Sequence, residues 1–125
     1  HSIVVQNGTI ENVLPNIVVQ QQNIPIHNHT EHNAIPALAD VQIYGAFGKL
    51  LAVYPTAETV DAIARYSVEG GAAWCMPTVA TNTYEVIYEC INAVRNYWQQ
   101  GGKHVLGLHI EGPWISMQKR GAHIA

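Results

Sequence analysis

Residues 72–113, AAWCMPTVATNTYEVIYECINAVRNYWQQGGKHVLGLHIEGP, contain two short apolar runs separated by a longer segment with helical periodicity. The runs, Ala72 to Thr78 and Val105 to Ile110, have the length and composition of buried strands. The segment between them carries one apolar stripe and ends before Gly101-Gly102. The stripe consists of Val86, Ile87, Cys90, Ile91, Val94 and Trp98. Two strands joined through a helix predict parallel pairing by a right-handed crossover.

The preceding residues repeat this alternation of strand and helix. Leu38 to Tyr44 is predicted to be a strand, and Thr56 is a suitable cap for the helix that follows it. Gly70-Gly71 is expected to end that helix. One face of the helix is predicted to hold Val60, Ile63, Ala64 and Val68. The next helix has a start resembling a capping box, because Asn82 is followed three positions later by Glu85.

Three strands separated by two helices fit either an open doubly wound sheet or a slice of a (β/α)8 barrel. A dinucleotide-binding sheet should carry G-x-G-x-x-G after its first strand, but Gly45-Ala46-Phe47-Gly48 lacks that spacing. In barrels, functional side chains gather at the carboxyl ends of the strands. The polar residues at these ends are Gln42, Tyr44, Thr78 and Glu111. We therefore expect an α/β fold, with the first three strands of an incomplete TIM-type barrel in residues 35–125.

Residues 1–34 are expected to form a small β segment and a loop that do not join the barrel sheet. Asn7-Gly8 is a strong signal for a hairpin turn, with Ile3 to Val5 before it and Ile10 after it. Ile17 to Val19 predicts another short strand, since β-branched residues favour strands. Gln20 to Asn33 has no periodicity and is predicted to be a loop.

Composition excludes several classes of partner. The chain has a formal net charge of -3 and no basic run, so nucleic acid is not expected. No apolar run reaches the roughly 18 residues that span a bilayer, and the first residues do not have the basic segment and apolar stretch expected of a secretory leader. Only 12% of residues are charged, which suggests that other protein covers much of the surface, as in a fragment or a homo-oligomer such as a dimer. The cysteines Cys75 and Cys90 are expected to be buried, unbonded thiols in a reducing, cytoplasmic compartment.

Glu111 is the strongest candidate for a functional residue. It directly follows an apolar strand and precedes Gly112-Pro113, which should turn the chain sharply. A carboxylate held in this way at a barrel mouth suits a metal ion. On spacing alone, a carboxylate that caps a surface turn is an equal alternative.

The sequence His109-Ile110-Glu111-Gly112-Pro113-Trp114, followed by Lys119-Arg120-Gly121-Ala122-His123, resembles the signature of the N-acetylglucosamine-6-phosphate deacetylases of the amidohydrolase superfamily. Asp40-Val41-Gln42-Ile43-Tyr44-Gly45, Met76-Pro77-Thr78 and Thr81-Asn82 extend the resemblance. It covers about Ile35 to Ile124.

The resemblance implies a role for two residues of the motif. Glu111 would be a ligand of one Zn-like divalent metal ion, and His123 would be the catalytic histidine that polarises the substrate carbonyl. The substrate would be a small amino sugar phosphate. Two further histidine ligands and an aspartate base would come from later strands, so the 125-residue chain by itself is expected to be inactive.

Other polar residues are open to more than one interpretation. Many amidohydrolases carry His-x-His where this chain has Gln42 and Tyr44, so it resembles the branch with a single metal; Tyr44 replaces a frequent Asn. Gln42 is either an organiser of water and loops or structural. His109 is expected to be hydrogen-bonded within the fold rather than a ligand.

The remaining histidines and two cations are weaker candidates. His27-Asn28-His29, with His32 behind it, is expected to be a surface loop rather than a metal site. Lys119 and Arg120 either attract an anionic sugar phosphate or belong to a solvated loop. Two functional alternatives stay open: another amidohydrolase with a different amide substrate, and a catalytically silent fragment that acts only within an assembly.

Overall fold

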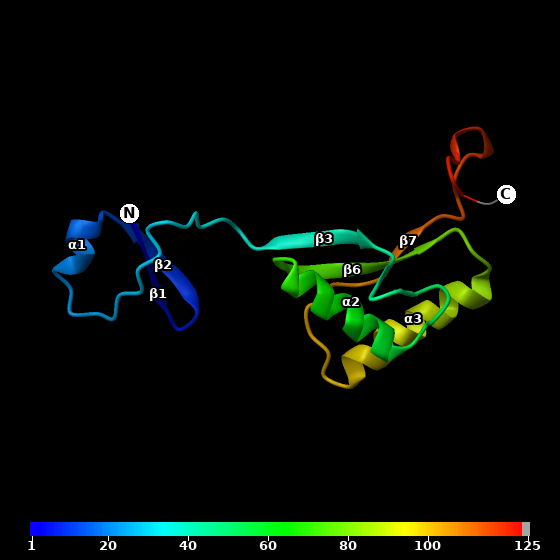
Figure 1. Ribbon diagram of the computed structural model, residues 1–125, viewed down its shortest axis with the longest axis horizontal. Coiled ribbons are helices and arrows are strands. Elements are labelled where there is room, and N and C mark those ends of the chain that lie inside the picture. The colour runs from blue at the N-terminus through cyan, green and yellow to red at the C-terminus, as the bar shows by residue number, and fades with distance from the viewer. Residues whose placement is uncertain (124–125) are drawn as a thin grey trace. The chain divides into compact units, whose positions relative to one another are not determined.

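The computed structural model describes residues 1–123, which divide into two compact units, His1–Ala34 and a second unit that begins at Ile35 (Figure 1). Each unit has its own sheet, so the two are described separately.

The first unit contains the expected hairpin. Strands β1 (Ser2–Gln6) and β2 (Thr9–Leu14) pair antiparallel, with an irregular register between Val4 and Val5. The connecting residues Asn7 and Gly8 have φ angles of 52° and 76°. Positive φ at both positions is the signature of the tight turn that Asn-Gly favours. The hairpin prediction is therefore confirmed.

The further strand expected after the hairpin, Ile17 to Val19, is a helix instead. These residues lie in α1 (Asn16–Gln20), which starts after Pro15. Pro15 is extended, and its carbonyl oxygen accepts a hydrogen bond from the Val18 amide at 3.0 Å, which closes the first turn. Val19 is buried, so its packing outweighs the strand preference of a β-branched side chain. Residues 21–34 follow without a helix or strand, as predicted.

The second unit is built on a parallel sheet in the order β3-β6-β7. Strand β3 (Leu38–Ile43) pairs with β6 (Ala72–Ala80), and β6 pairs with β7 (His109–Glu111). The parallel arrangement predicted from the alternating pattern is confirmed. The third strand is shorter than predicted, since only an isolated bridge between Val105 and Cys75 pairs the start of the run. Gly107 interrupts it, and a glycine weakens a strand because it has no side chain to pack.

Helix α2 (Ala57–Glu69) starts at the predicted cap. The Thr56 side chain accepts a hydrogen bond from the Thr59 amide at 3.3 Å, and Gly71, just after the helix, has a φ of 95°. Three of the four residues assigned to the buried face are buried, but Val68 is exposed and Ser67 lies inside. The last turn therefore faces the core at a slightly different angle from the one predicted.

Helix α3 (Tyr84–Gln99) begins one residue later than predicted. Thr83, rather than Asn82, is the cap, and its side chain accepts a hydrogen bond from the Val86 amide at 3.4 Å. Asn82 instead accepts one from the Thr83 amide at 2.9 Å. At the other end, Tyr97 is 6% exposed and Trp98 is 43% exposed, so Tyr97 ends the buried stripe.

Helices α2 and α3 lie on the same side of the sheet and enclose the core with it (Figure 1). A short hairpin that the sequence analysis missed, β4 (Gly45–Ala46) and β5 (Lys49–Leu50), leads into the fully buried Leu51. Cys75 and Cys90 are buried and unbonded, as expected. Their pKa values are raised by burial, that of Cys90 to about 11.

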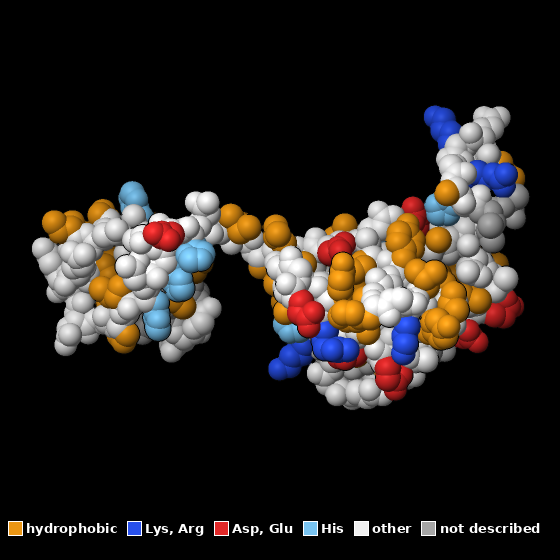
Figure 2. All heavy atoms as spheres, in the orientation of Figure 1, with side chains coloured by type: hydrophobic (Ala, Val, Ile, Leu, Met, Phe, Trp, Pro, Cys, Tyr) orange, Lys and Arg blue, Asp and Glu red, His pale blue; other side chains and the backbone are white. Residues whose placement is uncertain are grey.

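Part of the sheet is not covered. The strand residues Val41 and Trp74, and Leu106 before β7, remain exposed. Figure 2 shows further hydrophobic side chains on the visible surface of this unit, among scattered charged ones. Among the helices of residues 1–123, none has the length and apolar character needed to cross a membrane.

Candidate active site

The carboxyl end of the parallel sheet brings together the polar residues singled out in the sequence. Glu111 is the last residue of β7 and pairs with Ala80, the last residue of β6. Gln42 lies near the end of β3, and Tyr44 follows it. Parallel strands present their carboxyl ends at one edge, which is where barrel proteins place their chemistry.

Thr78 lies in the same part of the sheet but has a structural role. Its buried hydroxyl accepts a hydrogen bond from the Ile43 amide at 3.0 Å and donates one to the Met76 carbonyl at 3.1 Å. The bond from Ile43 joins β3 to β6 where the register between them shifts, and the bond to Met76 lies within β6. Thr78 therefore fixes the end of β3, and with it Tyr44.

The Glu111 carboxylate accepts from a chain of donors formed by Gln42 of β3 and by Tyr44, which follows that strand. The Tyr44 phenol donates a hydrogen bond to Oε2 of Glu111, and the Gln42 amide donates one to the Tyr44 oxygen at 2.8 Å. The hydrogen bond from Tyr44, followed by weaker effects of Gln42 and His123, holds the pKa of Glu111 below its usual range. The same bond raises the pKa of Tyr44. Glu111 is therefore an ionised acceptor at neutral pH.

His123 reaches Glu111 from the segment that follows the 3-10 helix η1 (Met117–Lys119). Its Nε2 lies 3.4 Å from Oε1 of Glu111, and its Nδ1 lies 2.8 Å from the hydroxyl of Thr81. The side chains of His123 and Glu111 are 15% and 27% exposed, so both are partly shielded and yet accessible. The structure thus brings the two predicted site residues into direct proximity.

Thr81, for which the sequence predicted no role, contacts both His123 and Glu111. Its hydroxyl oxygen bonds to the His123 ring and lies 3.4 Å from the Glu111 carbonyl oxygen. Thr81 directly follows β6, so the position of a polar residue at this strand end was the signal that could have found it.

The other candidates lie apart from this cluster. His109 has the hydrogen bond expected of it, since its Nδ1 donates to the Val41 carbonyl at 2.9 Å. His27, His29 and His32 are exposed in the loop of the first unit. Across residues 1–123, no three His, Cys, Asp or Glu side chains are placed so that they could hold a metal ion.

A cavity of about 310 Å³ opens beside His123. Arg120, Thr81 and His123 supply polar atoms to its wall, and Pro113, Ile115 and Met117 supply apolar ones. Lys119 is exposed and does not line the cavity, whereas Arg120 is partly buried and does. Of the two cations considered in the sequence analysis, Arg120 is thus the one placed near the candidate site.

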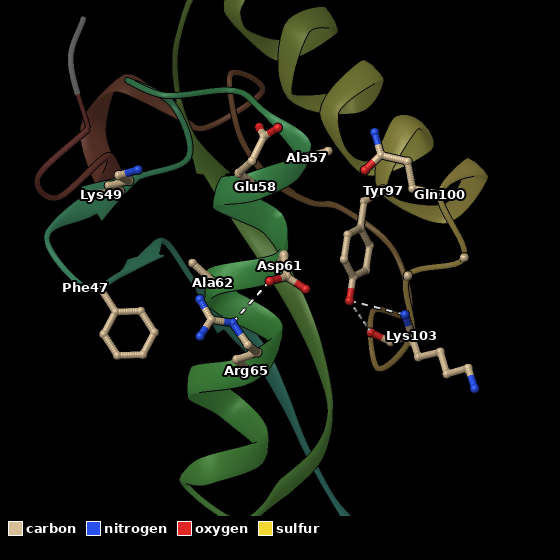
Figure 3. Close-up of a pocket in the computed structure, with 12 residues that line it drawn as sticks. Phe47, Lys49, Ala57, Glu58, Asp61, Ala62, Arg65, Tyr97, Gln100 and Lys103 are labelled. Atoms are coloured by element: carbon tan, nitrogen blue, oxygen red, sulfur yellow. Dashed lines mark hydrogen bonds and ion pairs between the residues drawn. The ribbon is translucent and has the colours of Figure 1, made fainter.

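A larger cavity of about 850 Å³ lies between α2, the end of α3 and the β4–β5 hairpin (Figure 3). Neither Glu111 nor His123 lines it. Arg65 pairs with Asp61 at 3.1 Å, and the Tyr97 hydroxyl donates to the Lys103 carbonyl at 2.7 Å. These polar groups already have partners, so we do not assign chemistry to this cavity.

The donors at the candidate site fit a divalent metal in kind but not in number. An ionised carboxylate is a suitable ligand for Zn²⁺, and an imidazole nitrogen lies close to it. A catalytic zinc site uses about three protein ligands and an open position. Glu111 can supply one of these, and the described residues do not complete the set.

No family model matches the chain. Curated relatives do. The chain is 39% identical to the N-acetylglucosamine-6-phosphate deacetylase of Homo sapiens over 93 residues, which are 70% of this chain and 22% of that protein. It is 26% identical to the enzyme of the same name from Haemophilus influenzae over 122 residues, 98% of this chain and 32% of that protein. An N-acetylgalactosamine-6-phosphate deacetylase from Shewanella sp. is 29% identical over 99 residues, 79% of this chain and 25% of that protein. The chain therefore spans at most about a third of the length of these relatives.

Comparison of the fold with solved structures identifies the same group of enzymes. The crystal structure of N-acetylglucosamine-6-phosphate deacetylase from Pasteurella multocida matches with a TM-score of 0.66 and 27% identity, over 70% of this chain and 23% of that one. Both the sequence and the arrangement of strands and helices are thus similar to those of known proteins. The resemblance predicted from the sequence is confirmed: this chain is similar, in sequence and in fold, to a part of the N-acetylglucosamine-6-phosphate deacetylases.

Proposed function

We propose that the protein containing this chain hydrolyses the acetamide of N-acetylglucosamine 6-phosphate, giving glucosamine 6-phosphate and acetate. One observation supports this most directly. Glu111 and His123, the residues that the family motif marks for metal binding and carbonyl polarisation, lie 3.4 Å apart at the carboxyl end of a parallel sheet. The similarity to deacetylases in sequence and fold adds to this support.

Glu111 and His123 would have different roles in the proposed reaction. Glu111 would be one ligand of a Zn-like divalent ion, which, when bound, supplies a Lewis acid and a water of lowered pKa. His123 would donate a hydrogen bond from Nε2 to the amide oxygen, where negative charge grows as water adds to the carbonyl carbon. Breakage of the C–N bond then needs a proton for the leaving amine, and a base outside the described residues would carry it.

Arg120 would help to recognise the substrate. Its guanidinium lines the cavity beside His123, and a phosphate is a natural partner for a guanidinium. This assignment agrees with an anionic sugar as the ligand, because a neutral amide would gain nothing from the charge.

The exposed strand residues support an incomplete barrel. Val41, Trp74 and Leu106 present apolar surface that further strands of a (β/α)8 barrel would cover. We propose that such strands supply the remaining ligands and the base, in a cytoplasmic homodimer. We accordingly expect the 125-residue chain by itself to release no acetate from N-acetylglucosamine 6-phosphate.

A second candidate substrate is N-acetylgalactosamine 6-phosphate, since one group of relatives is named for that activity. The two sugars differ in configuration at one carbon, and we assign none of the described site residues to a contact with the hydroxyl at that carbon. Measuring acetate release from both sugars by the whole protein separates the two proposals. A kcat/KM higher for the glucosamine derivative supports the first, a reversed preference supports the second, and no hydrolysis of either contradicts both.

A further inference from the structure

We propose that Thr81 is a positioning residue for His123: its hydroxyl donates a hydrogen bond to Nδ1 and thereby keeps the ring hydrogen of the neutral imidazole on Nε2. This inference rests on the proposed function, since it gives His123 the donor that carbonyl polarisation needs. Thr81 acts through His123 and does not itself touch the reacting atoms.

The contact between Thr81 and the ring is the shorter of the two that its hydroxyl makes. The distance from Oγ1 to Nδ1 is 2.8 Å, whereas that from Oγ1 to the Glu111 carbonyl oxygen is 3.4 Å. A hydroxyl has one hydrogen to donate, and the shorter contact has the length of a normal O–H hydrogen bond. The longer contact exceeds the roughly 2.5–3.0 Å usual for an O–H···O bond, so donation to the Glu111 carbonyl would bind the hydroxyl hydrogen only weakly. We therefore place that hydrogen on the bond with Nδ1, which makes Nδ1 an acceptor.

The surroundings of the other ring nitrogen agree with this assignment. Nε2 lies 3.4 Å from Oε1 of the Glu111 side chain. A bare nitrogen lone pair facing a carboxylate oxygen would be repulsive, whereas an N–H is attractive. The contact at Nε2 thus favours a hydrogen on that nitrogen, and the contact at Nδ1 is the one that distinguishes the neutral ring proposed here.

The turn after β7 leaves space for the Thr81 hydroxyl at Gly112. A Cβ at Gly112 would overlap Oγ1 of Thr81, and the φ of Gly112 is 102°. Only glycine leaves room for the hydroxyl at this place and accepts such a backbone angle readily. The hydroxyl is consequently confined between Gly112 and His123.

The alternative assignment reverses the bonds. Thr81 would then donate to the Glu111 carbonyl oxygen and accept from an Nδ1–H, which would leave Nε2 without a hydrogen. In that case His123 could not donate to a substrate carbonyl while neutral. The two assignments therefore differ in which ring nitrogen carries the hydrogen, and this can be measured without substrate or metal.

The test combines nitrogen NMR with kinetics on the whole protein. Metal-free protein labelled with ¹⁵N-histidine is studied at about pH 9, well above the ordinary histidine pKa of about 6.5. The signals of His123 are those that disappear in His123→Asn. Three variants are compared: Thr81→Val, which removes the hydroxyl at constant shape, Thr81→Ser, which keeps it, and Thr9→Val, a control at an exposed position in β2.

We expect the wild-type spectrum to show Nδ1 without a hydrogen and displaced from the position of a free ring nitrogen by the bond it accepts. Thr81→Val should abolish that displacement and lower kcat about 10- to 100-fold with little change in KM, the usual effect of losing a group that orients a functional histidine. Thr81→Ser should restore both, and Thr9→Val should change neither. A protonated Nδ1 in the wild type, or a Thr81→Val spectrum and kcat equal to those of the wild type, would overturn the inference. Inactive wild-type protein would refute the proposed function alone, since the spectrum still decides the role of Thr81.

Discussion

The Tyr44 phenol donates a hydrogen bond to the Glu111 carboxylate, which lies 67 positions further along the chain. Tyr44 follows β3 and Glu111 ends β7, and the two strands are separated in the sheet by β6. The bond therefore passes across the end of the central strand and links the two outer ones. It also gives Glu111 a donor that keeps the carboxylate ionised, the state in which it can hold a metal.

Removing this donor should change the acidity of Glu111. We expect Tyr44→Phe to raise the pKa of Glu111 toward its ordinary value of 4.5, because the hydrogen bond from Tyr44 is the main cause of its lowered pKa. Carbon NMR of the labelled carboxyl, followed through an acid titration, measures this. Tyr54→Phe, at an exposed position, is the control. An unchanged titration in Tyr44→Phe would contradict the assigned bond.

The hydrogen bond between Tyr44 and Glu111 should also affect how the free energy of unfolding changes with pH. A carboxyl whose pKa is lower in the folded than in the unfolded state stabilises the fold above its unfolded pKa and loses this contribution as pH falls through the folded pKa. Wild-type protein should therefore lose more stability than Tyr44→Phe as the pH falls below about 4.5. Urea unfolding at a series of pH values compares the two, and parallel curves would count against the effect.

Gly112→Ala should destabilise the protein by about 1–3 kcal/mol, the range for a non-glycine residue held in a rarely occupied backbone region. Its φ is 102°, and the added Cβ would overlap the Thr81 hydroxyl. Gly107→Ala is the matched control, because a Cβ there meets only the Met76 side chain at 3.7 Å. Urea denaturation gives both free energies of unfolding, and equal values for the two variants would be inconsistent with this account.

Thr83→Ala should lower the free energy of unfolding by about 0.5–1 kcal/mol, since it removes the side chain that caps α3. Thr83→Ser keeps a hydroxyl at the same place and should retain most of that stability. The comparison tests the corrected helix start. If the serine variant lost as much stability as the alanine variant, the capping bond would not be the cause.

The parallel sheet could be predicted because its signal is local and repeated. Ala72 to Thr78 and Val105 to Ile110 are short apolar runs, and glycines end the helical segments on either side of β6. The predictions were wrong where tertiary packing determines the secondary structure or the buried face of a helix. Val19 is buried in a helix despite its preference for strands, and Tyr97 rather than Trp98 faces the core. Periodicity alone cannot distinguish neighbouring aromatic residues at the end of a helix.

The candidate site was predictable in part. The motif singled out Glu111 and His123, and the structure brings them together. The place of Thr81 at a strand end could have marked it as a candidate, but the partners of Tyr44 and Thr81 could not be derived, because each contact joins residues distant in sequence. Such pairings follow from the register of the parallel strands, which the sequence pattern does not specify.

His123→Ala should lower the rate of acetate release while metal content stays unchanged, because His123 is assigned to the carbonyl oxygen and not to the metal. The expected loss in kcat is about 10²- to 10³-fold, the usual effect of removing one oxyanion donor. His32→Ala, in the exposed loop of the first unit, is the control. Loss of metal in His123→Ala would instead make this residue a ligand.

The central claim is that Glu111 holds the catalytic metal, and Glu111→Gln in the whole protein tests it most directly. Glutamine keeps the shape of the side chain but removes its charge, so metal affinity and rate should fall together. The measurement is metal content per protomer and acetate release from N-acetylglucosamine 6-phosphate on the same samples, with Glu11→Gln as an exposed control. We predict a joint loss in Glu111→Gln and no change in Glu11→Gln. Full metal content and full activity in Glu111→Gln would contradict the account.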